Sequence, residues 1–283
     1  MRGAGCRAGC RLLSHLSKVY SPAGFIQPYH HIPMSIPRDV REFIDEYPGV
    51  GDDPNASENL LFYSNALRCR PDNHLIDEIH DQWLGDYRKL EYKHGFIQWL
   101  FPIREHGMNW ESQPLQLHEI ETMKANPEIM SRIVKSYELM LDFYGMRLLS
   151  QETGLLGRVL PPRNFEARYR NLVTSSHNYL RISRILKCLS ELGLEHLSLG
   201  FLLHILNEQS QHNELEARGL QSSMDRWWAN CLRNQADRVW ISDAISRVRA
   251  DEFVFTREEY EKTLLNRKQN GFFGAMGEEK ATE

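Results

Sequence analysis

Apolar residues recur three and four positions apart over most of the chain, and no stretch alternates apolar and polar residues over the length of a strand. The clearest segment begins at Asn126 and Pro127, which are typical of a helix cap and first turn, and continues to about Ser150. Its regularly spaced apolar residues are Ile129, Ile133, Tyr137, Met140, Leu141 and Tyr144. The pattern predicts an all-α fold, a single irregular domain of about seven to nine helices.

Other helix boundaries can be inferred from residues that favour caps. We expect Ser57 and Asp72 to begin two successive helices, the first of which carries Leu60, Leu61, Tyr63, Asn65 and Leu67. Asn164 is expected to cap a helix that continues through Leu172, and Gly193 to end a later helix in the left-handed conformation. Thr256 and Glu259 have the spacing of a capping box.

The amino-terminal residues are expected to lie outside this helical domain. Pro22, Pro28, Pro33 and Pro37 disfavour helix at the residues before them, so we assign residues 1–37 to a disordered or targeting leader. Basic residues and leucines at helical spacing precede the first acidic residue, Asp39, as in a mitochondrial presequence. A disordered leader with incidental basic residues is the alternative. We assign residues 38–210 to the helical domain and residues 211–283 to a C-terminal helical extension.

Composition excludes several classes of protein. With 41% hydrophobic and 25% charged residues, the chain has the composition of a soluble globular protein, and its net charge of −4 offers no general attraction for nucleic acid. No uninterrupted apolar run is long enough for a transmembrane helix. The five cysteines are scattered, which favours free thiols over a disulfide framework.

Motifs for catalysis and cofactor binding are absent from the sequence. The twelve histidines include no HxxxH or HExxH pair, so we expect no metal site. There is also no GxSxG motif and no glycine-rich loop in phosphate-binding order. The sequence therefore favours a protein that is not an enzyme and has no cofactor.

Residues 59–110 combine many aromatic residues with charges of both signs, and their order is distinctive. The strings NLLFYSNALRCRPDNHLIDEIHDQWLGDYRKLE (residues 59–91) and HGFIQWLFPIREHGMNW (residues 94–110) resemble the conserved region of the opioid growth factor receptor family. Two later strings, IVKSYELMLDFYGMRL (residues 133–148) and SHNYLRISRILKCLSELGLEHL (residues 176–197), resemble it in the same order. The resemblance spans roughly residues 57–210.

The resemblance implies a function and a location. It implies binding of an enkephalin-type peptide, linked to regulation of cell growth, by a receptor in the nucleus or at a perinuclear or peripheral membrane. A helical protein–protein interaction module without a peptide ligand is the alternative function. The cytoplasm is an alternative location, as is the mitochondrion if residues 1–37 act as a presequence.

Two groups of residues are candidates for binding. The aromatic and charged residues expected to line a peptide site are Trp83, Asp86, Tyr87, Glu91, Trp99 and Arg104, and the alternative is that Trp83 and Trp99 belong to the core. Arg181, Arg184 and Lys187 are three residues apart and share one helix face. That face is expected either to contact an anionic partner or to be a solvated surface.

Overall fold

Three long helices form the centre of the core: α7 (Pro127–Tyr144), α9 (His177–Glu191) and α10 (Glu195–His212), each with more than ten buried residues. The computed structural model describes residues 36–274 and residue 276, which form thirteen α-helices, one short 3-10 helix and one two-stranded sheet. All belong to one compact unit. In α10 every residue from position 197 to 209 is buried, so this helix is surrounded by the rest of the unit.

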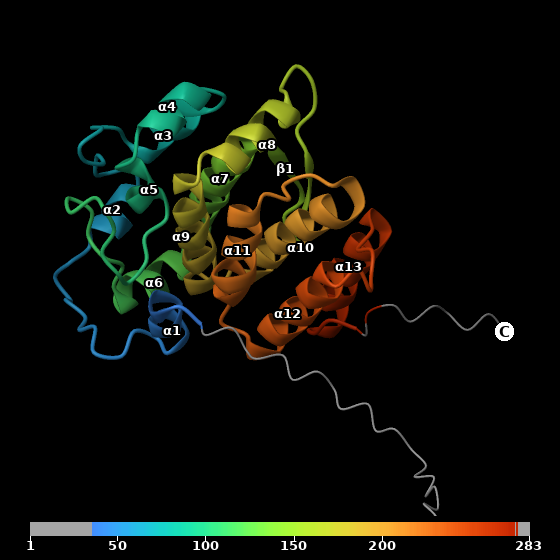
Figure 1. Ribbon diagram of the computed structural model, residues 1–283. Coiled ribbons are helices and arrows are strands. Elements are labelled where there is room, and N and C mark those ends of the chain that lie inside the picture. Colours follow the sequence, from blue (N-terminus) through green and yellow to red (C-terminus); the bar gives the residue numbers. More distant parts are fainter. Residues whose placement is uncertain (1–35, 275, 277–283) are drawn as a thin grey trace, which may run out of the picture. The chain divides into compact units, whose positions relative to one another are not determined.

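The remaining helices are short in the first half of the chain and longer in the second. They are α1 (Arg38–Ile44), α2 (Glu58–Tyr63), α3 (Ile76–Trp83), α4 (Tyr87–Tyr92), α5 (Phe96–Leu100), α6 (Leu117–Ala125), α8 (Phe165–Thr174), α11 (Arg218–Arg226), α12 (Gln235–Arg249) and α13 (Arg257–Asn270). Helices α2, α3 and α6 pack against α7, whereas α12 and α13 pack against α10 (Figure 1). The 3-10 helix covers Trp228–Asn230.

The helical class is confirmed, but the predicted number of helices is too low. Helices α4 and α5 have only six and five residues, too short to give a clear apolar period in the sequence. Each is stabilised by packing, because helices this short are marginal on their own. The helix predicted after Ser57 is present as α2, but it ends at Tyr63, so Asn65 and Leu67 lie beyond it.

The prediction that α7 continues to Ser150 is wrong. Gly145 has φ +86° and ends the helix in the left-handed conformation, and its N–H group donates to the carbonyl groups of Leu141 and Asp142. The next residues form β1 (Met146–Ser150), which pairs antiparallel with β2 (Leu155–Arg158). The strand could not be recognised from the sequence, because five residues are too few to establish an alternating pattern.

Most of the predicted caps are present. The side-chain oxygens of Asn126, Asn164 and Thr256 each accept a hydrogen bond from a backbone N–H group in the first turn of their helices. Gly193 has φ +75°, as expected after α9. The Ser57 side chain precedes α2 but makes no capping hydrogen bond. Asp72 does not begin a helix, because α3 starts after Leu75.

The two predicted domain boundaries, at residues 37 and 210, can be compared with the structure. The leader, residues 1–37, lies almost wholly outside the described residues. At the other end, α10 continues through residue 210, and α12 and α13 pack on it. The division at residue 210 stays a prediction.

The structure also bears on the predictions about membrane-spanning helices and cysteines. Among the helices of the described residues, none is both long and apolar enough to cross a membrane. Cys69, Cys188 and Cys231 are buried free thiols, whereas Cys6 and Cys10 lie outside the described residues.

Candidate functional site

Trp83 and Trp99, expected to line a peptide site, lie inside the hydrophobic core. Their exposed fractions are 1% and 0%. The Trp83 ring packs edge-on against Phe96, with ring centres 5.2 Å apart, and the Trp99 indole N–H donates to the carbonyl oxygen of Arg70 at 2.9 Å. The alternative interpretation of both tryptophans as core residues therefore holds.

Asp86 and Tyr87 lie at the start of α4. The Asp86 side chain caps the helix by accepting a hydrogen bond from the backbone N–H of Lys89 at 3.0 Å. The Tyr87 ring is half-buried, with the Arg168 guanidinium 4.5 Å from its centre. Both residues therefore have structural partners in their own neighbourhood.

Glu91 and Arg104 are also held by neighbours within the fold. The Glu91 carboxylate accepts from the Asn171 side-chain amide at 2.9 Å and lies 3.1 Å from His177 Nε2. The buried Arg104 donates to backbone carbonyl groups of residues 46 and 50. None of the six predicted peptide-lining residues lines either cavity described below.

Arg181, Arg184 and Lys187 share one face of α9, as the spacing predicted, but this face is buried. Residues 90–105 cover it and supply carbonyl groups that accept hydrogen bonds from Arg181 and Arg184. The solvated-surface alternative is therefore wrong, because helical spacing identifies a shared face without revealing what covers it. Contact with an anionic partner stays a prediction.

The same three side chains line a cavity of about 480 Å³ between α9 and residues 94–108. Ile97 and Ile103 form apolar parts of its wall. Met108 and Leu180 also line it and are 88% and 72% exposed, so they mark its opening to solvent. The cavity thus joins a charged interior to an apolar rim.

Two of the three cations, Lys187 and Arg181, have several polar partners each. Lys187 Nζ lies 2.7 Å from Glu105 Oε1 and 3.3 Å from Asp39 Oδ2. Burial alone lowers the pKa of Lys187, but these carboxylates outweigh it and hold the pKa above its ordinary value. Arg181 donates to several backbone carbonyl groups, including that of Lys93 at 2.7 Å.

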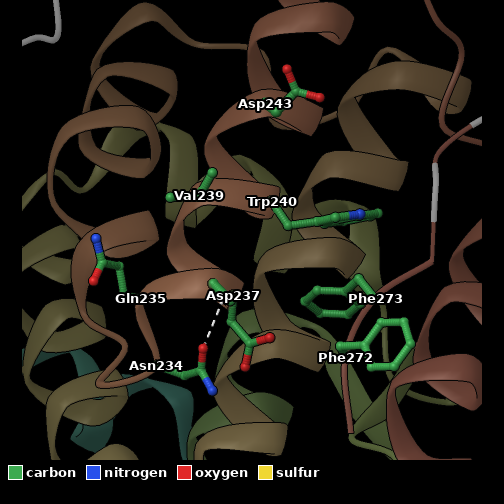
Figure 2. A pocket seen from close by; sticks show the side chains of 9 residues that line it. Asn234, Gln235, Asp237, Val239, Trp240, Asp243, Phe272 and Phe273 are labelled. Atoms are coloured by element: carbon green, nitrogen blue, oxygen red, sulfur yellow. Dashed lines mark hydrogen bonds between the residues drawn. The ribbon is translucent and has the colours of Figure 1, made fainter. Parts of the chain in front are cut away.

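A second cavity, of about 890 Å³, is an open groove on α12 beside the segment that follows α13 (Figure 2). Trp240 and Phe273 stack there, with ring centres 4.4 Å apart, and Val239 and Phe272 are exposed. Asp237 at the groove pairs with Arg267 at 2.9 Å. Our sequence reasoning missed this groove, and the consecutive phenylalanines at 272 and 273 were the available signal.

Buried histidines raise the question of catalysis. His204 Nε2 lies 3.1 Å from the Tyr169 hydroxyl and 3.6 Å from Glu208, whose carboxylate accepts hydrogen bonds from Arg158. All members except Arg158 are buried, and none lines either cavity. Within the part of the chain that the structure describes, no group of three His, Cys, Asp or Glu residues has a metal-binding arrangement.

A pH effect is expected from His80, whose Nε2 lies 2.9 Å from the Ser136 hydroxyl. Burial lowers the pKa of His80 from 6.5 to about 4, despite the nearby Asp77 and Asp81. The unfolded chain therefore binds this proton more readily, and acidification from pH 6.5 towards 4 should remove on the order of 2 kcal/mol from the free energy of unfolding. Urea unfolding of the His80→Gln variant should show a flatter pH dependence in this range.

The matched control is the exposed His212 at the end of α10. His212→Gln should leave the pH dependence as it is in the natural chain. An equally steep loss of stability in His80→Gln would show that other groups cause it.

The fold and its sites define a predominantly helical protein with a charge-lined cavity along a central helix. The chain belongs to the opioid growth factor receptor family: the family model described as the opioid growth factor receptor (OGFr) conserved region matches residues 52–262. This match confirms the resemblance found in the sequence and extends past residue 210.

Curated relatives agree with this assignment. The opioid growth factor receptor of Homo sapiens is 44% identical over 184 residues, which are 63% of this chain and 26% of that protein. The receptor of Rattus norvegicus is 42% identical over 209 residues, which are 72% of this chain and 35% of that protein. The opioid growth factor receptor-like protein 1 of Rattus norvegicus is 37% identical over 203 residues, which are 71% of this chain and 42% of that protein.

The matched regions are therefore less than half the length of each of these relatives. The relatives are named as receptors or receptor-like proteins and none of these names denotes an enzyme. No solved structure matches this chain.

Proposed function

We propose that this chain is a non-enzymatic binding protein that takes an enkephalin-type peptide and is linked to regulation of cell growth. The names of its relatives support the class of function. The observation that carries the proposal is the cavity along α9, because it combines charges of both signs with apolar walls.

The chemistry of the cavity suits a short peptide better than a purely apolar ligand. Its volume of about 480 Å³ lies within the usual range for small-ligand sites. The lining carries both carboxylates and cations for the polar groups of a peptide, and Ile97 and Leu180 supply apolar surface for side chains. A ligand of on the order of forty heavy atoms at roughly 0.3 kcal/mol each has enough interaction energy for tight binding, although ordering the peptide offsets several kcal/mol.

Calorimetric titration of the full chain with methionine enkephalin tests this function. We expect saturable binding of this peptide and none of a scrambled peptide of the same composition that ends in glycine. Leu180→Glu should weaken binding at least about tenfold, because it introduces a charge at the apolar rim. Leu180 is largely exposed, so this change should leave the fold intact.

Leu160→Glu is the matched control, since Leu160 is also exposed and does not line the cavity. It should bind the peptide like the natural chain. Absence of binding at high micromolar peptide would count against the proposal.

The alternative function is a helical protein–protein interaction module. The open groove on α12 favours it, because Val239 and Phe272 expose apolar surface beside the stacked Trp240 and Phe273 (Figure 2). Failure to bind peptide, with full solubility and an intact fold, would favour this alternative.

For the location, we propose the nucleus or a perinuclear or peripheral membrane, on the strength of the family alone. Fluorescence imaging of the chain fused at its carboxyl end to a fluorescent protein tests this. Uniform cytoplasmic signal, or signal coincident with mitochondria, would support one of the two alternatives.

A further inference from the structure

Arg184 is a buried cation without an ionic partner among the described residues. Its exposed fraction is 8%, and only its Nε makes a hydrogen bond to a described residue, donating to the carbonyl oxygen of Phe101 at 2.8 Å. No carboxylate of residues 36–274 lies within ion-pair distance of its guanidinium. Burial lowers the pKa of Arg184 to about 10, so it is still charged at neutral pH.

The terminal nitrogens of Arg184 make no hydrogen bond to a described residue, and they lie at the cavity along α9. Arg184 lines that cavity, and a Cβ atom placed on Gly107 would lie 3.0 Å from its Nη1. The terminal nitrogens are therefore next to a glycine that leaves space beside them. A charged group in such a place is costly unless an ion or ligand compensates it.

The neighbouring cations do not compete for the same ligand. Lys187 is already paired with Glu105 and Asp39, and Arg181 is occupied by backbone carbonyl groups. The cavity lining thus has one more cation than carboxylate, and Arg184 is the cation with free donors among the described residues. A carboxylate fits its planar guanidinium, which can donate two parallel hydrogen bonds.

The apolar rim of the cavity indicates which part of a ligand would accompany its carboxylate. Met108 and Leu180 expose apolar side chains at the opening, and Ile97 lies in the wall. A ligand suited to this arrangement carries a carboxylate on an apolar body, as a peptide does when its last residue is apolar. Such a ligand places its charge at Arg184 and its side chain against the rim.

We propose that Arg184 binds the terminal carboxylate of a peptide that ends in an apolar residue, in the cavity along α9. This inference rests on the proposed function and names the end of the peptide that enters the cavity. It extends to short peptides that lack the amino-terminal part of an enkephalin.

The test uses acetylated Phe-Met with a free carboxylate and the same dipeptide as its amide, titrated calorimetrically into the full chain. We expect the acid to bind at least about tenfold more tightly than the amide, since only the acid is an anion. Arg184→Gln should abolish this preference. Arg170→Gln, which removes an exposed arginine of α8, should keep it.

A second variant tests the same site in case the Arg184→Gln chain does not fold. Gly107→Ala places its Cβ against the Gln98 side chain and close to Arg184 Nη1, so it should weaken binding of the acid while keeping the charge. Gly51→Ala is its control, because a Cβ there meets no atom within 4 Å. Hexanoate, a free carboxylic acid without peptide groups, should bind more weakly than the dipeptide acid if the site recognises a peptide terminus.

The possible outcomes separate this inference from the proposed function. If enkephalin and its amide bind equally well and Arg184→Gln changes neither, the peptide function stands and the Arg184 inference is overturned. If enkephalin fails to bind but the dipeptide acid binds through Arg184, the inference stands without that ligand. If the acetylated Phe-Met acid does not bind at concentrations up to about 10 mM, the Arg184 inference is overturned.

Discussion

Gly200→Ala is expected to lower the free energy of unfolding by at least about 3 kcal/mol. Gly200 lies in the middle of α10, and a Cβ there would be 1.8 Å from the backbone carbonyl oxygen of Gly154 in the hairpin turn. Gly154 is equally constrained, because it has φ +78° and its own Cβ would lie 2.3 Å from the carbonyl oxygen of His196. Backbone atoms cannot move aside as a flexible side chain can, so the alanine must separate the turn from α10.

The separation would also disturb the contact with α13. The Tyr260 hydroxyl donates to the carbonyl oxygen of Gly200 at 2.9 Å and accepts from the N–H of Leu156 at the same distance. One buried side chain thus joins α13, α10 and β2. We expect the effect of Gly200→Ala to extend to these neighbours as a loss of cooperativity.

Urea unfolding followed by circular dichroism measures this effect. Gly219→Ala is the control, because Gly219 also lies in a helix, α11, and its Cβ would make only ordinary contact with Tyr179 at 3.4 Å. Alanine favours helix by up to about 1 kcal/mol over glycine, so the control should be neutral or stabilising. Equal midpoints for Gly200→Ala and the natural chain would refute the argument from close approach.

Glu119→Ala should destabilise the fold by about 3 kcal/mol or more. The Glu119 carboxylate is completely buried in α6 and accepts hydrogen bonds from the backbone N–H groups of Asn59, Leu60 and Gln116. It also accepts from the side-chain amides of Asn59 and Gln113. Alanine would leave all these donors buried or partly buried without their acceptor.

This carboxylate performs two capping functions at once. It satisfies N–H groups at the start of α2 and reaches back to the residue that begins its own helix, α6. Glu119→Gln should destabilise less than alanine, because one oxygen acceptor remains. Thermal and urea unfolding of both variants measure the difference.

Glu121→Ala is the control on the same helix. Glu121 is exposed, and its replacement should change the free energy of unfolding by less than about 0.5 kcal/mol. If Glu119→Ala were as mild as this control, the carboxylate would not be the structural centre of the α2–α6 contact.

The sequence predicted the helices whose signals are local. Asn126 followed by Pro127, Asn164, Thr256 and Gly193 each act within one turn of their own position, and the structure confirms these boundaries. The family was also recognisable, because the order of four distinctive strings needs no three-dimensional information.

The candidate sites were harder to predict because they depend on what covers each side chain. Helical spacing correctly placed Arg181, Arg184 and Lys187 on one face, yet residues 90–105 bury that face. A mixture of aromatic and charged residues suggested a peptide site around Trp83 and Trp99, but their rings fill the core. Glu119 gave no signal, since its partners lie up to 60 residues away in the chain.

The sequence by itself determined the helical class, several helix caps and the family, because periodicity, caps and distinctive strings are properties of neighbouring residues. Only the tertiary structure decided which charges are paired and which cavity they line. Hydrogen bonding and burial depend on segments brought together from distant positions, as Arg184 and Phe101 are. The close approach of Gly154 and Gly200 likewise exists only once the hairpin rests on α10.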